Sequence, residues 1–516
     1  MSIHSLFSFT KIVATLGPAS ATPEAIEALV REGARVLRIN FSHGEQADHA
    51  RLLEAAREAG RRSGRHLGVL GDLGGPKIRV GEVAAPGLEL AAGDAVLFAS
   101  DARAAEVDTE ACRRLKARAI LGTTLPQLVD AVLPGHQLLI NDGAVRLACT
   151  GHVQEAGQRL MRCEVTVPGR VTTRKGINAP DSELNVPSLT DRDRLCARWA
   201  VEQELDFLAL SFVRRTSDLM ELRHFLRELQ PNGHRMPIIA KIEKPQALRE
   251  LDAICEQADA LMVARGDLGV EMELAQVPVI QKQVIAKAHH HGKPVIVATQ
   301  MLETMIENEH PTRAEVSDIA NAIYDGADAV MLSGETSVGR NPPRVVQVMR
   351  RISQITQEDL ASPEGRGRAG LIRQPPGRLQ ETRYRTAALA HGVSTIVNDL
   401  GAVLIVTWSQ NGGTARYLSQ NRIGAPIVAC SSDAHSLRRM SLLNAVYPVH
   451  MERPASVEQF VTAADKLVRE RRWASLGDRL VIVAGEPIGA PKVTNVIRIH
   501  IVGDRASPPA SAAAPS

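Results

Sequence analysis

Short apolar runs recur between residues 11 and 332, and most of them end in polar or charged residues. After the first run, Thr22 can cap a helix that has Pro23 at its first position. Between two later runs, Leu248, Leu251 and Ile254 stand at near-helical spacing. The pattern predicts strands that alternate with helices, as in a parallel sheet. The strands are predicted at residues 11–16, 34–41, 67–73, 207–213, 237–240, 260–264, 294–299 and 329–332.

Eight such units predict an α/β fold of the TIM (β/α)8 barrel class, in which the carboxyl ends of the strands form the rim that carries the active site. An open doubly wound sheet is the alternative. We favour the barrel because no GxGxxG follows the first strand. In addition, polar residues follow most of the strands and do not gather at one switch point.

Short alternating runs separated by turns such as Asn141-Asp142-Gly143 interrupt this pattern. They predict a small β-barrel domain inserted into the TIM barrel. A stretch rich in Gly, Pro and Arg predicts a linker to a smaller C-terminal α/β domain. The expected divisions are barrel 1–80, insertion 81–187, barrel 188–361, linker 362–380, C-terminal α/β domain 381–503 and disordered tail 504–516.

Composition narrows the possible functions. Lys plus Arg number 61 against 58 Asp plus Glu, so no overall field attracts nucleic acid, and aromatic residues make up only 3% of the chain. The six cysteines include no close pair such as CxxC, so neither a disulfide framework nor a zinc site is indicated. No uncharged run reaches the roughly 18 residues that span a membrane, and the N-terminus lacks the pattern of a secretory signal. We expect a cytoplasmic protein that binds neither nucleic acid nor membranes.

Charged residues follow two neighbouring predicted strands: Lys241 and Glu243 after the first, and Arg265 and Asp267 after the second. Because the ends of parallel strands meet on one rim, we expect these side chains to lie close together. A lysine and two carboxylates suit a divalent cation and an anionic substrate. Each charge taken alone could equally be a solvated loop residue, but their recurrence at equivalent strand ends favours a site.

Nine motifs stand in order along the chain: KIVATLGPAS, RINFSHG, PKIRVG, KGIN, LSFVR, IIAKIEKPQAL, VARGDLGVE, VATQML and MLSGETSVG. In this order the chain resembles the pyruvate kinase family from Thr10 to about Gly503. The resemblance implies transfer of a phosphoryl group from phosphoenolpyruvate to ADP, followed by protonation of the enolate to pyruvate, the last step of glycolysis. It also implies that the insertion is a mobile lid over the barrel, and that the last domain serves effector binding and assembly into a homotetramer.

The resemblance further implies roles for single residues. Glu243 and Asp267 are expected to bind Mg2+ or Mn2+, which prefer oxygen ligands. Lys241 is expected to hold its ammonium against the phosphoryl group, and the backbone amides of Gly266 and Asp267 to hold the substrate carboxylate. Further catalytic or substrate-binding residues implied are Arg38, Arg79, Thr299 and Ser333, and the nucleotide-binding residues implied are Asn40, Ser42, His43, Arg79 and Lys175. By residue type alone, a Thr or Ser that ends a strand is as often a helix cap.

One pair of positions departs from the family pattern. Many members bind K+ with the equivalents of Asn40, Ser42, Asp72 and a threonine at the position of Leu73, and they have a glutamate at the position of Lys77. A fixed ammonium near that site repels a cation by about a kcal/mol or more. We therefore expect Lys77 to pair with Asp72 and to replace K+, which is then not required. The alternative is that Lys77 points to solvent.

Two other functions stay open. A lyase or aldolase acting on pyruvate-like acids also places Glu and Asp around Mg2+, but it would not need Arg79 and Lys175. A silent paralogue acting as a regulatory subunit would have lost Lys241 or a metal carboxylate, and none is lost. His289-His290-His291 stand at a predicted helix end, where the dipole favours them, and we do not interpret them as a metal site. The turn Gly412-Gly413 could hold a phosphorylated effector of open identity through its amides.

Overall fold

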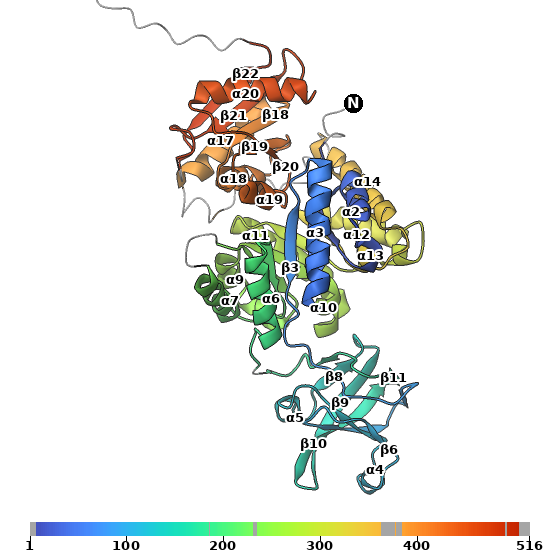
Figure 1. Cartoon of the computed structure of the whole chain (residues 1–516). Helices are drawn as coiled ribbons and strands as arrows, with labels where there is room; N and C mark the ends of the chain where they lie inside the picture. Colours follow the sequence, from blue (N-terminus) through green and yellow to red (C-terminus); the bar gives the residue numbers. More distant parts are fainter. Residues whose placement is uncertain are drawn as a thin grey trace, which may run out of the picture.

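The computed structural model describes residues 7–184, 186–230, 235–362, 377, 384–490 and 493–504. Figure 1 shows three parts in a row, with the barrel in the middle. The C-terminal domain lies on one side of the barrel and the β-rich insertion on the other. The predicted linker 362–380 and tail 504–516 lie outside the described residues except for 362, 377 and 504. Among the described segments, no helix is long and apolar enough to cross a membrane.

Eight parallel strands close into a barrel in the order β1-β17-β16-β15-β14-β13-β3-β2. The predicted TIM barrel is therefore confirmed. Nearly every strand residue is buried, which explains why the runs are continuously apolar: helices cover one face and the barrel interior the other. The strands are β1 Lys11–Thr15, β2 Ala34–Asn40, β3 Gly68–Asp72, β13 Phe207–Leu210, β14 Ile238–Ile242, β15 Ala260–Ala264, β16 Val295–Ala298 and β17 Ala329–Leu332.

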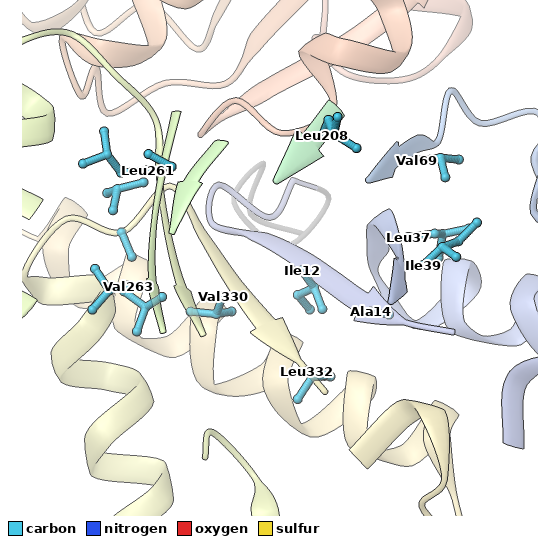
Figure 2. Close-up of a cluster of buried hydrophobic side chains, with 14 of the residues drawn as sticks. Ile12, Ala14, Leu37, Ile39, Val69, Leu208, Leu261, Val263, Val330 and Leu332 are labelled. Carbon is cyan, nitrogen blue, oxygen red and sulfur yellow. The ribbon is translucent and has the colours of Figure 1, made fainter. Parts of the chain in front are cut away.

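Alternation along each strand divides the core into two layers. Ile12 and Ala14 of β1 belong to the layer between strands and helices, part of which Figure 2 shows. Val13, between them, belongs to the layer inside the barrel. Because successive side chains of a strand point to opposite faces, one short run serves both layers. Polar residues at the carboxyl ends of the strands then lie on the rim above this core.

Helices follow the barrel strands. The first, α2, begins after Thr22 as predicted, since the Thr22 side chain accepts a hydrogen bond from the Ala25 amide and Pro23 stands at the first position. The helix predicted between β14 and β15 is divided at Glu250 into two. The barrel helices include α2 Pro23–Glu32, α3 Gln46–Ser63, α6 Asp191–Glu202, α7 Thr216–Leu229, α8 Pro245–Arg249, α9 Leu251–Gln257, α10 Arg265–Glu271, α11 Val277–His290, α12 Arg313–Tyr324, α13 Gly334–Ser337 and α14 Pro342–Ala361.

The insertion is built mainly of strands, as predicted. Its described strands form a seven-stranded sheet, β12-β8-β9-β10-β5-β7-β6, and a two-stranded ribbon, β11-β4. The segment that enters the insertion joins the two ends of this sheet, since Arg79 pairs with Gly176 beside β12 and Val80 pairs with Thr123 beside β7. This arrangement agrees with the small β-barrel predicted here. The elements are β4 Leu88–Leu90, β5 Ala95–Ala99, β6 Glu106–Val107, α4 Glu110–Arg114, β7 Ala119–Gly122, α5 Leu128–Ala131, β8 Gln137–Ile140, β9 Val145–Glu155, β10 Gln158–Val167, β11 Gly169–Val171 and β12 Ile177–Asn178.

The C-terminal domain has a five-stranded sheet in the order β20-β19-β18-β21-β22, with helices between its strands, as expected for an α/β unit. All neighbours are parallel except β22, which runs antiparallel to β21. The elements are α17 Tyr384–Leu400, β18 Leu404–Trp408, α18 Gly413–Gln420, β19 Ile427–Ser431, α19 Ala434–Met440, β20 Val446–His450, α20 Val457–Glu470, β21 Arg479–Ala484 and β22 Val496–Ile501.

Candidate active site

Lys241 is the centre of a buried charge network on the barrel rim. Its Nζ lies 2.8 Å from Glu243 Oε1 and 3.3 Å from Asp72 Oδ1, and it donates to Ser211 Oγ at 2.8 Å. Lys241 is 8% exposed, and Asp72 and Glu243 are 1% exposed. The three strands concerned, β3, β13 and β14, are neighbours in the barrel, so their carboxyl ends bring these side chains together.

The charges of this network are strongly coupled. Burial opposes the charge of Lys241, yet the carboxylates of Asp72, Glu243 and Asp267 raise its pKa above the ordinary value. Burial also acts against ionised Asp72, but Lys241 and Arg38 hold the Asp72 pKa below its usual range. Glu243 differs, because burial and the nearby charge of Asp267 raise its pKa although Lys241 opposes them. The carboxylates therefore hold Lys241 protonated, while Glu243 lacks full compensation by positive charge.

Arg38, at the end of β2, is fixed from two sides. Its Nε and Nη2 lie 2.8 and 2.7 Å from Asp72 Oδ2, and its Nη1 donates to Thr15 Oγ1 at 3.0 Å. Thr15 in turn donates to the Leu332 carbonyl at 2.8 Å. Since an arginine held this rigidly loses little entropy on binding phosphate, Arg38 is suited to its predicted role.

Glu243 and Asp267 offer oxygen donors that suit a divalent cation. Glu243 Oε2 accepts the Phe212 amide at 2.9 Å, whereas Asp267 is exposed and makes no side-chain hydrogen bond or ion pair with the described residues. Their mutual repulsion, which helps to raise the Glu243 pKa, is what a bound cation would relieve. No group of three His, Cys, Asp or Glu side chains among the described residues could hold a metal. Two carboxylates fit Mg2+, which keeps waters and takes oxygens from substrate phosphate.

Thr299 has a strained backbone next to these carboxylates. Its φ is +69° and that of Gln300 is +52°, which is rare for a β-branched residue. Arg265 Nη2 donates to the carbonyls of both, at 2.8 and 3.2 Å, and so holds this conformation. Thr299 Oγ1 accepts the Gly266 amide at 2.7 Å and donates to the Ala298 carbonyl. A substrate carboxylate that binds the Gly266 amide would therefore either share this amide with Thr299 Oγ1 or displace Thr299 Oγ1 from it.

Ser333 follows the last barrel strand, β17. Its amide donates to Glu335 Oε2 at 2.6 Å. Its Oγ is buried and has no hydrogen-bond partner among the described residues. An unpaired buried hydroxyl is costly, so a bound water or substrate group is expected to satisfy it.

The predicted nucleotide residues come from two parts of the chain. Asn40, Ser42 and His43 follow β2, where Asn40 Oδ1 accepts the Ser42 amide at 3.1 Å. Arg79 enters the insertion beside Lys175: Arg79 pairs with Gly176 in an isolated antiparallel bridge. Burial lowers the His43 pKa, and the positive charges of Lys77, Arg79 and Arg38 lower it further, so these basic groups surround His43.

The prediction that Lys77 pairs with Asp72 is wrong. Both Asp72 oxygens are taken, by Arg38 and by Lys241. Lys77 is exposed and lines a cavity of about 300 Å3 between insertion and barrel, together with Asp267. Although the residue as a whole is exposed, partial desolvation of its ammonium in this cavity and the charge of Lys241 lower its pKa. The nearby carboxylates Asp267, Glu243 and Asp72 oppose this shift, so the Lys77 charge acts on the groups of the rim.

Sequence reasoning missed a link between insertion and barrel. Asn178 Nδ2 of β12 donates to Glu271 Oε1 at 2.6 Å, and Lys244 Nζ lies 2.5 Å from the same oxygen. Glu271 is 5% exposed. It also missed Ser211 and Phe212, whose φ is +55°. The motifs KGIN, VARGDLGVE, LSFVR and IIAKIEKPQAL contain all five of these residues, but nothing in the sequence indicates that Asn178 and Glu271 meet.

Two of the three histidines at the end of α11, His289 and His291, have separate polar partners. His289 Nε2 lies 2.9 Å from the Gly326 carbonyl and 2.7 Å from Arg422, and burial together with Arg422 lowers its pKa to about 3. His291 Nε2 lies 3.0 Å from Asp252. These contacts explain His289 and His291 as structural residues.

Comparison with known proteins places the chain in a family. The model of the pyruvate kinase barrel domain matches residues 7–346, and that of the pyruvate kinase alpha/beta domain matches 387–500. The pyruvate kinase of Corynebacterium efficiens is 38% identical over 495 residues, covering 96% of this chain and 98% of that protein. That of Methylorubrum extorquens is 39% identical over 493 residues, covering 96% and 97%. The crystal structure of a pyruvate kinase from Cryptosporidium parvum superimposes with a TM-score of 0.84 at 30% identity, covering 97% of both chains. This chain therefore belongs to the pyruvate kinase family.

Proposed function

We propose that this protein transfers the phosphoryl group of phosphoenolpyruvate to ADP, giving pyruvate and ATP in the last step of glycolysis. The observation that carries the proposal is the buried, protonated Lys241, held by Asp72 and Glu243 on the barrel rim. The full-length similarity to pyruvate kinases supports it.

Lys241 and Arg38 supply positive charge to the group in transfer. An oxygen of the ADP β-phosphate forms the new bond to phosphorus while the bond from phosphorus to the enol oxygen breaks. Charge spreads over the phosphoryl oxygens, so fixed cations that need no reorganisation lower the barrier. The Asp72 carboxylate keeps both cations in place before substrate arrives.

The remaining enolate must be oriented and protonated. The amides of Gly266 and Asp267 and the Thr299 hydroxyl would bind its carboxylate, since the Gly266 amide and Thr299 Oγ1 already meet at 2.7 Å. We assign the Ser333 hydroxyl, which is buried and has no hydrogen-bond partner among the described residues, to the relay that delivers the proton to the methylene carbon. Arg79 and Lys175 of the lid, with Asn40, Ser42 and His43, would bind the nucleotide.

Ions complete the proposal. Glu243 and Asp267 would hold Mg2+ or Mn2+, which would neutralise negative charge on the substrate oxygens. The charge of Lys77 acts on the site expected for a monovalent cation, so we propose that K+ is not required. The residues of that site are Asn40, Ser42, Asp72 and Leu73. The Leu73 carbonyl already accepts the Ser211 hydroxyl at 2.6 Å.

A phosphorylated effector is proposed for a cavity of about 740 Å3 between the barrel and the C-terminal domain. The turn Gly412-Gly413 lines it, and Gly412 has a φ of +74° directly before α18. Backbone amides at such a turn can bind phosphate, and guanidinium groups match its oxygens. The arginines that line the cavity are Arg235, Arg385, Arg416 and Arg439.

We also propose a homotetramer in the cytoplasm. The six cysteines are free thiols, which is typical of a reducing compartment. Exposed apolar residues on the edge strand β22 support assembly through the C-terminal domain.

A coupled assay tests the function. Pyruvate formation from phosphoenolpyruvate is measured with and without ADP, in the presence of Mg2+. We expect turnover that requires ADP and yields one ATP per pyruvate. Pyruvate formed from other acids without ADP would instead indicate a lyase. Binding of phosphoenolpyruvate without turnover would indicate a silent paralogue.

A further inference from the structure

Cys149 and Cys163 lie opposite one another in the insertion, although 149 and 163 are far from a CxxC spacing. They are paired residues of the antiparallel strands β9 and β10. Directly opposite residues of an antiparallel pair point to the same face of the sheet, so the two thiols face each other. Both belong to the same buried cluster and are 2% and 0% exposed.

The backbone hydrogen bonds of Cys149 show whether it forms a hydrogen-bonded or a non-hydrogen-bonded pair with Cys163. Its amide donates to the His136 carbonyl at 2.8 Å, and its carbonyl accepts the Gly135 amide at 2.8 Å. Both backbone groups of Cys149 therefore point away from β10. The pair with Cys163 is of the non-hydrogen-bonded kind, in which the Cα atoms are about 4.5 Å apart and the side chains are closest. This separation falls within the range of about 4.4–6.8 Å that disulfides accept.

The two thiols also interact. The interaction with Cys163, acting against burial, lowers the Cys149 pKa, and the same interaction together with burial raises the Cys163 pKa. We therefore assign Cys149, the thiol with the lower pKa, as the attacking sulfur and Cys163 as the resolving one. This is the asymmetry that an attacking and a resolving cysteine require.

The ladder between β9 and β10 is interrupted beside the pair. The register of β9 and β10 shifts next to Cys163, so that Thr150 has no partner across the ladder. Gly151, next along, has a φ of +150°. A bulge interrupts the ladder locally, and local opening at this point can admit a small oxidant.

We propose that Cys149 and Cys163 form a redox-active thiol pair that a hydroperoxide oxidises to an intramolecular disulfide. The Cys149 thiolate attacks a peroxide oxygen, the O–O bond breaks, and with one proton the products are a sulfenic acid and water or an alcohol. The Cys163 sulfur then attacks the Cys149 sulfur, the S–O bond breaks, and hydroxide leaves as water with the Cys163 proton. Two thiols are oxidised and one peroxide is reduced.

The test uses the full-length protein and hydrogen peroxide as the probe. After exposure to a small molar excess, free thiols are alkylated and peptides are mapped by mass spectrometry without reductant. We expect a Cys149–Cys163 cross-linked peptide, two fewer titratable thiols per chain, and recovery of both with dithiothreitol. Because the disulfide is mapped in the parent protein, this measurement does not depend on whether a cysteine variant folds.

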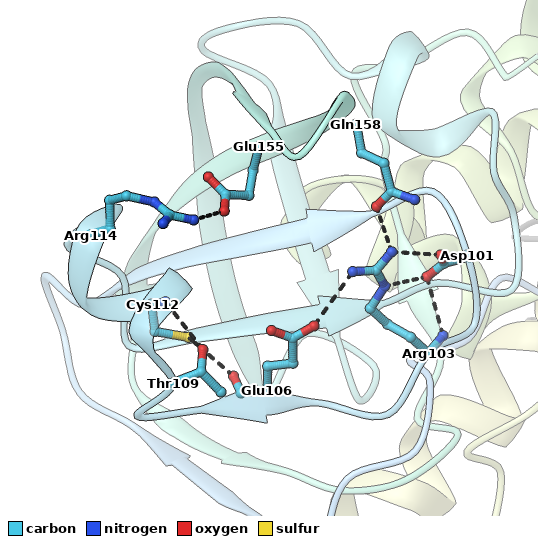
Figure 3. A network of polar contacts seen from close by, with 8 residues as sticks. All are labelled: Asp101, Arg103, Glu106, Thr109, Cys112, Arg114, Glu155 and Gln158. Carbon is cyan, nitrogen blue, oxygen red and sulfur yellow. Dashed lines mark hydrogen bonds and ion pairs between the residues drawn. The ribbon is translucent and has the colours of Figure 1, made fainter.

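Two variants sharpen the test. Cys163→Ser removes the resolving thiol, so Cys149 should accumulate as a sulfenic acid that dimedone traps. Cys112→Ser is the matched control, because Cys112 is a buried thiol of the same domain whose sulfur contacts Thr109 and the Glu106 carbonyl (Figure 3). It should leave the cross-link unchanged. The proposal is overturned if both Cys149 and Cys163 of the oxidised parent are recovered in alkylated form, or if the disulfide joins other cysteines.

Discussion

At the scale of single residues, Lys241 combines deep burial with a full charge. It is stable in this position because Asp72 and Glu243 lie within 3.3 and 2.8 Å, and the same contacts aim its ammonium at the rim. From the sequence alone, a lysine at a strand end is expected to contribute charge and little to the stability of the fold. The observed pairing indicates otherwise, since loss of one partner leaves buried carboxylates uncompensated.

Lys241→Met should lower kcat by roughly three orders of magnitude or more, because the main cation at the phosphoryl group is lost. It should also lower Tm, for the reason just given. Steady-state assays and thermal unfolding measure the two effects. Lys282→Met is the control, since Lys282 pairs with Asp325 on the barrel surface away from the site. Activity of the Lys241 variant within tenfold of the parent would refute the assigned role.

Asp267→Asn tests the metal site. Asp267 makes no side-chain contact with described residues that the change would break, so stability should be preserved while one ligand charge is lost. We expect the Mg2+ concentration for half-maximal activity to rise at least tenfold. Asp142→Asn, in the same cavity on the side of the insertion, serves as control. Overlapping metal titrations of parent and Asp267 variant would show that Asp267 is not a ligand.

Lys77 leads to a prediction about monovalent cations. Its charge lies near Lys241, Asp267 and Glu243, so activity should vary little with KCl at constant ionic strength in a tetramethylammonium buffer. The double variant Lys77→Glu with Leu73→Thr should acquire dependence on K+. The single variants separate the change of charge from the repacking of buried Leu73. Activation of the parent tenfold or more by K+ would contradict the proposal.

At the scale of elements, the short strand β12 joins the insertion to the barrel. Asn178 on β12 and Lys244 after β14 both contact Glu271 at the end of α10. A buried carboxylate shared by an amide and an ammonium is a specific contact that exists only while insertion and barrel are together. The lid position is therefore set in part by this contact.

Glu271→Gln should loosen the lid, because the charge that holds Lys244 and Asn178 is removed. We expect KM for ADP to rise several-fold with a smaller change in kcat, and faster proteolysis at the junctions of the insertion. Glu273→Gln, an exposed glutamate on the same segment, should change neither quantity. Equal proteolysis rates and equal KM values for the Glu271 variant and the parent would rule out the role.

At the scale of the whole molecule, the sheet of the C-terminal domain ends in β22. Figure 1 places this strand on the side of the domain away from the barrel. Ile499 and Ile501 on it are 52% and 42% exposed. An exposed apolar edge strand is a site for pairing with another chain, and native proteins normally cover it.

We expect a homotetramer at micromolar concentration by light scattering, with β22 in a subunit contact. Replacing Ile499 and Ile501 by Glu should reduce the mass to that of a smaller species. The control is Leu195→Glu, an exposed leucine on α6 of the barrel that is 68% exposed. A parent protein that scatters as a monomer would exclude the assembly.

The sequence by itself determined the barrel and the chemistry of its rim. The barrel strands are buried on both faces, so their apolar runs stand out in the sequence, and the polar residues that end them, Lys241 and Glu243 among them, are local to each run. The order of these local signals also indicated the family. The motifs of that family could be interpreted residue by residue, because each motif lies within one strand and the turn that follows it.

Only the tertiary structure decided which distant residues meet. Asp72 and Lys241 pair because β3 and β14 both flank β13 in the barrel, and this pairing leaves no place for Lys77 on Asp72. Cys149 and Cys163 face each other because of the register of one hairpin, and a slip of one residue would turn them to opposite faces. Register and long-range pairing depend on contacts between segments, and a pattern read along the chain does not contain them.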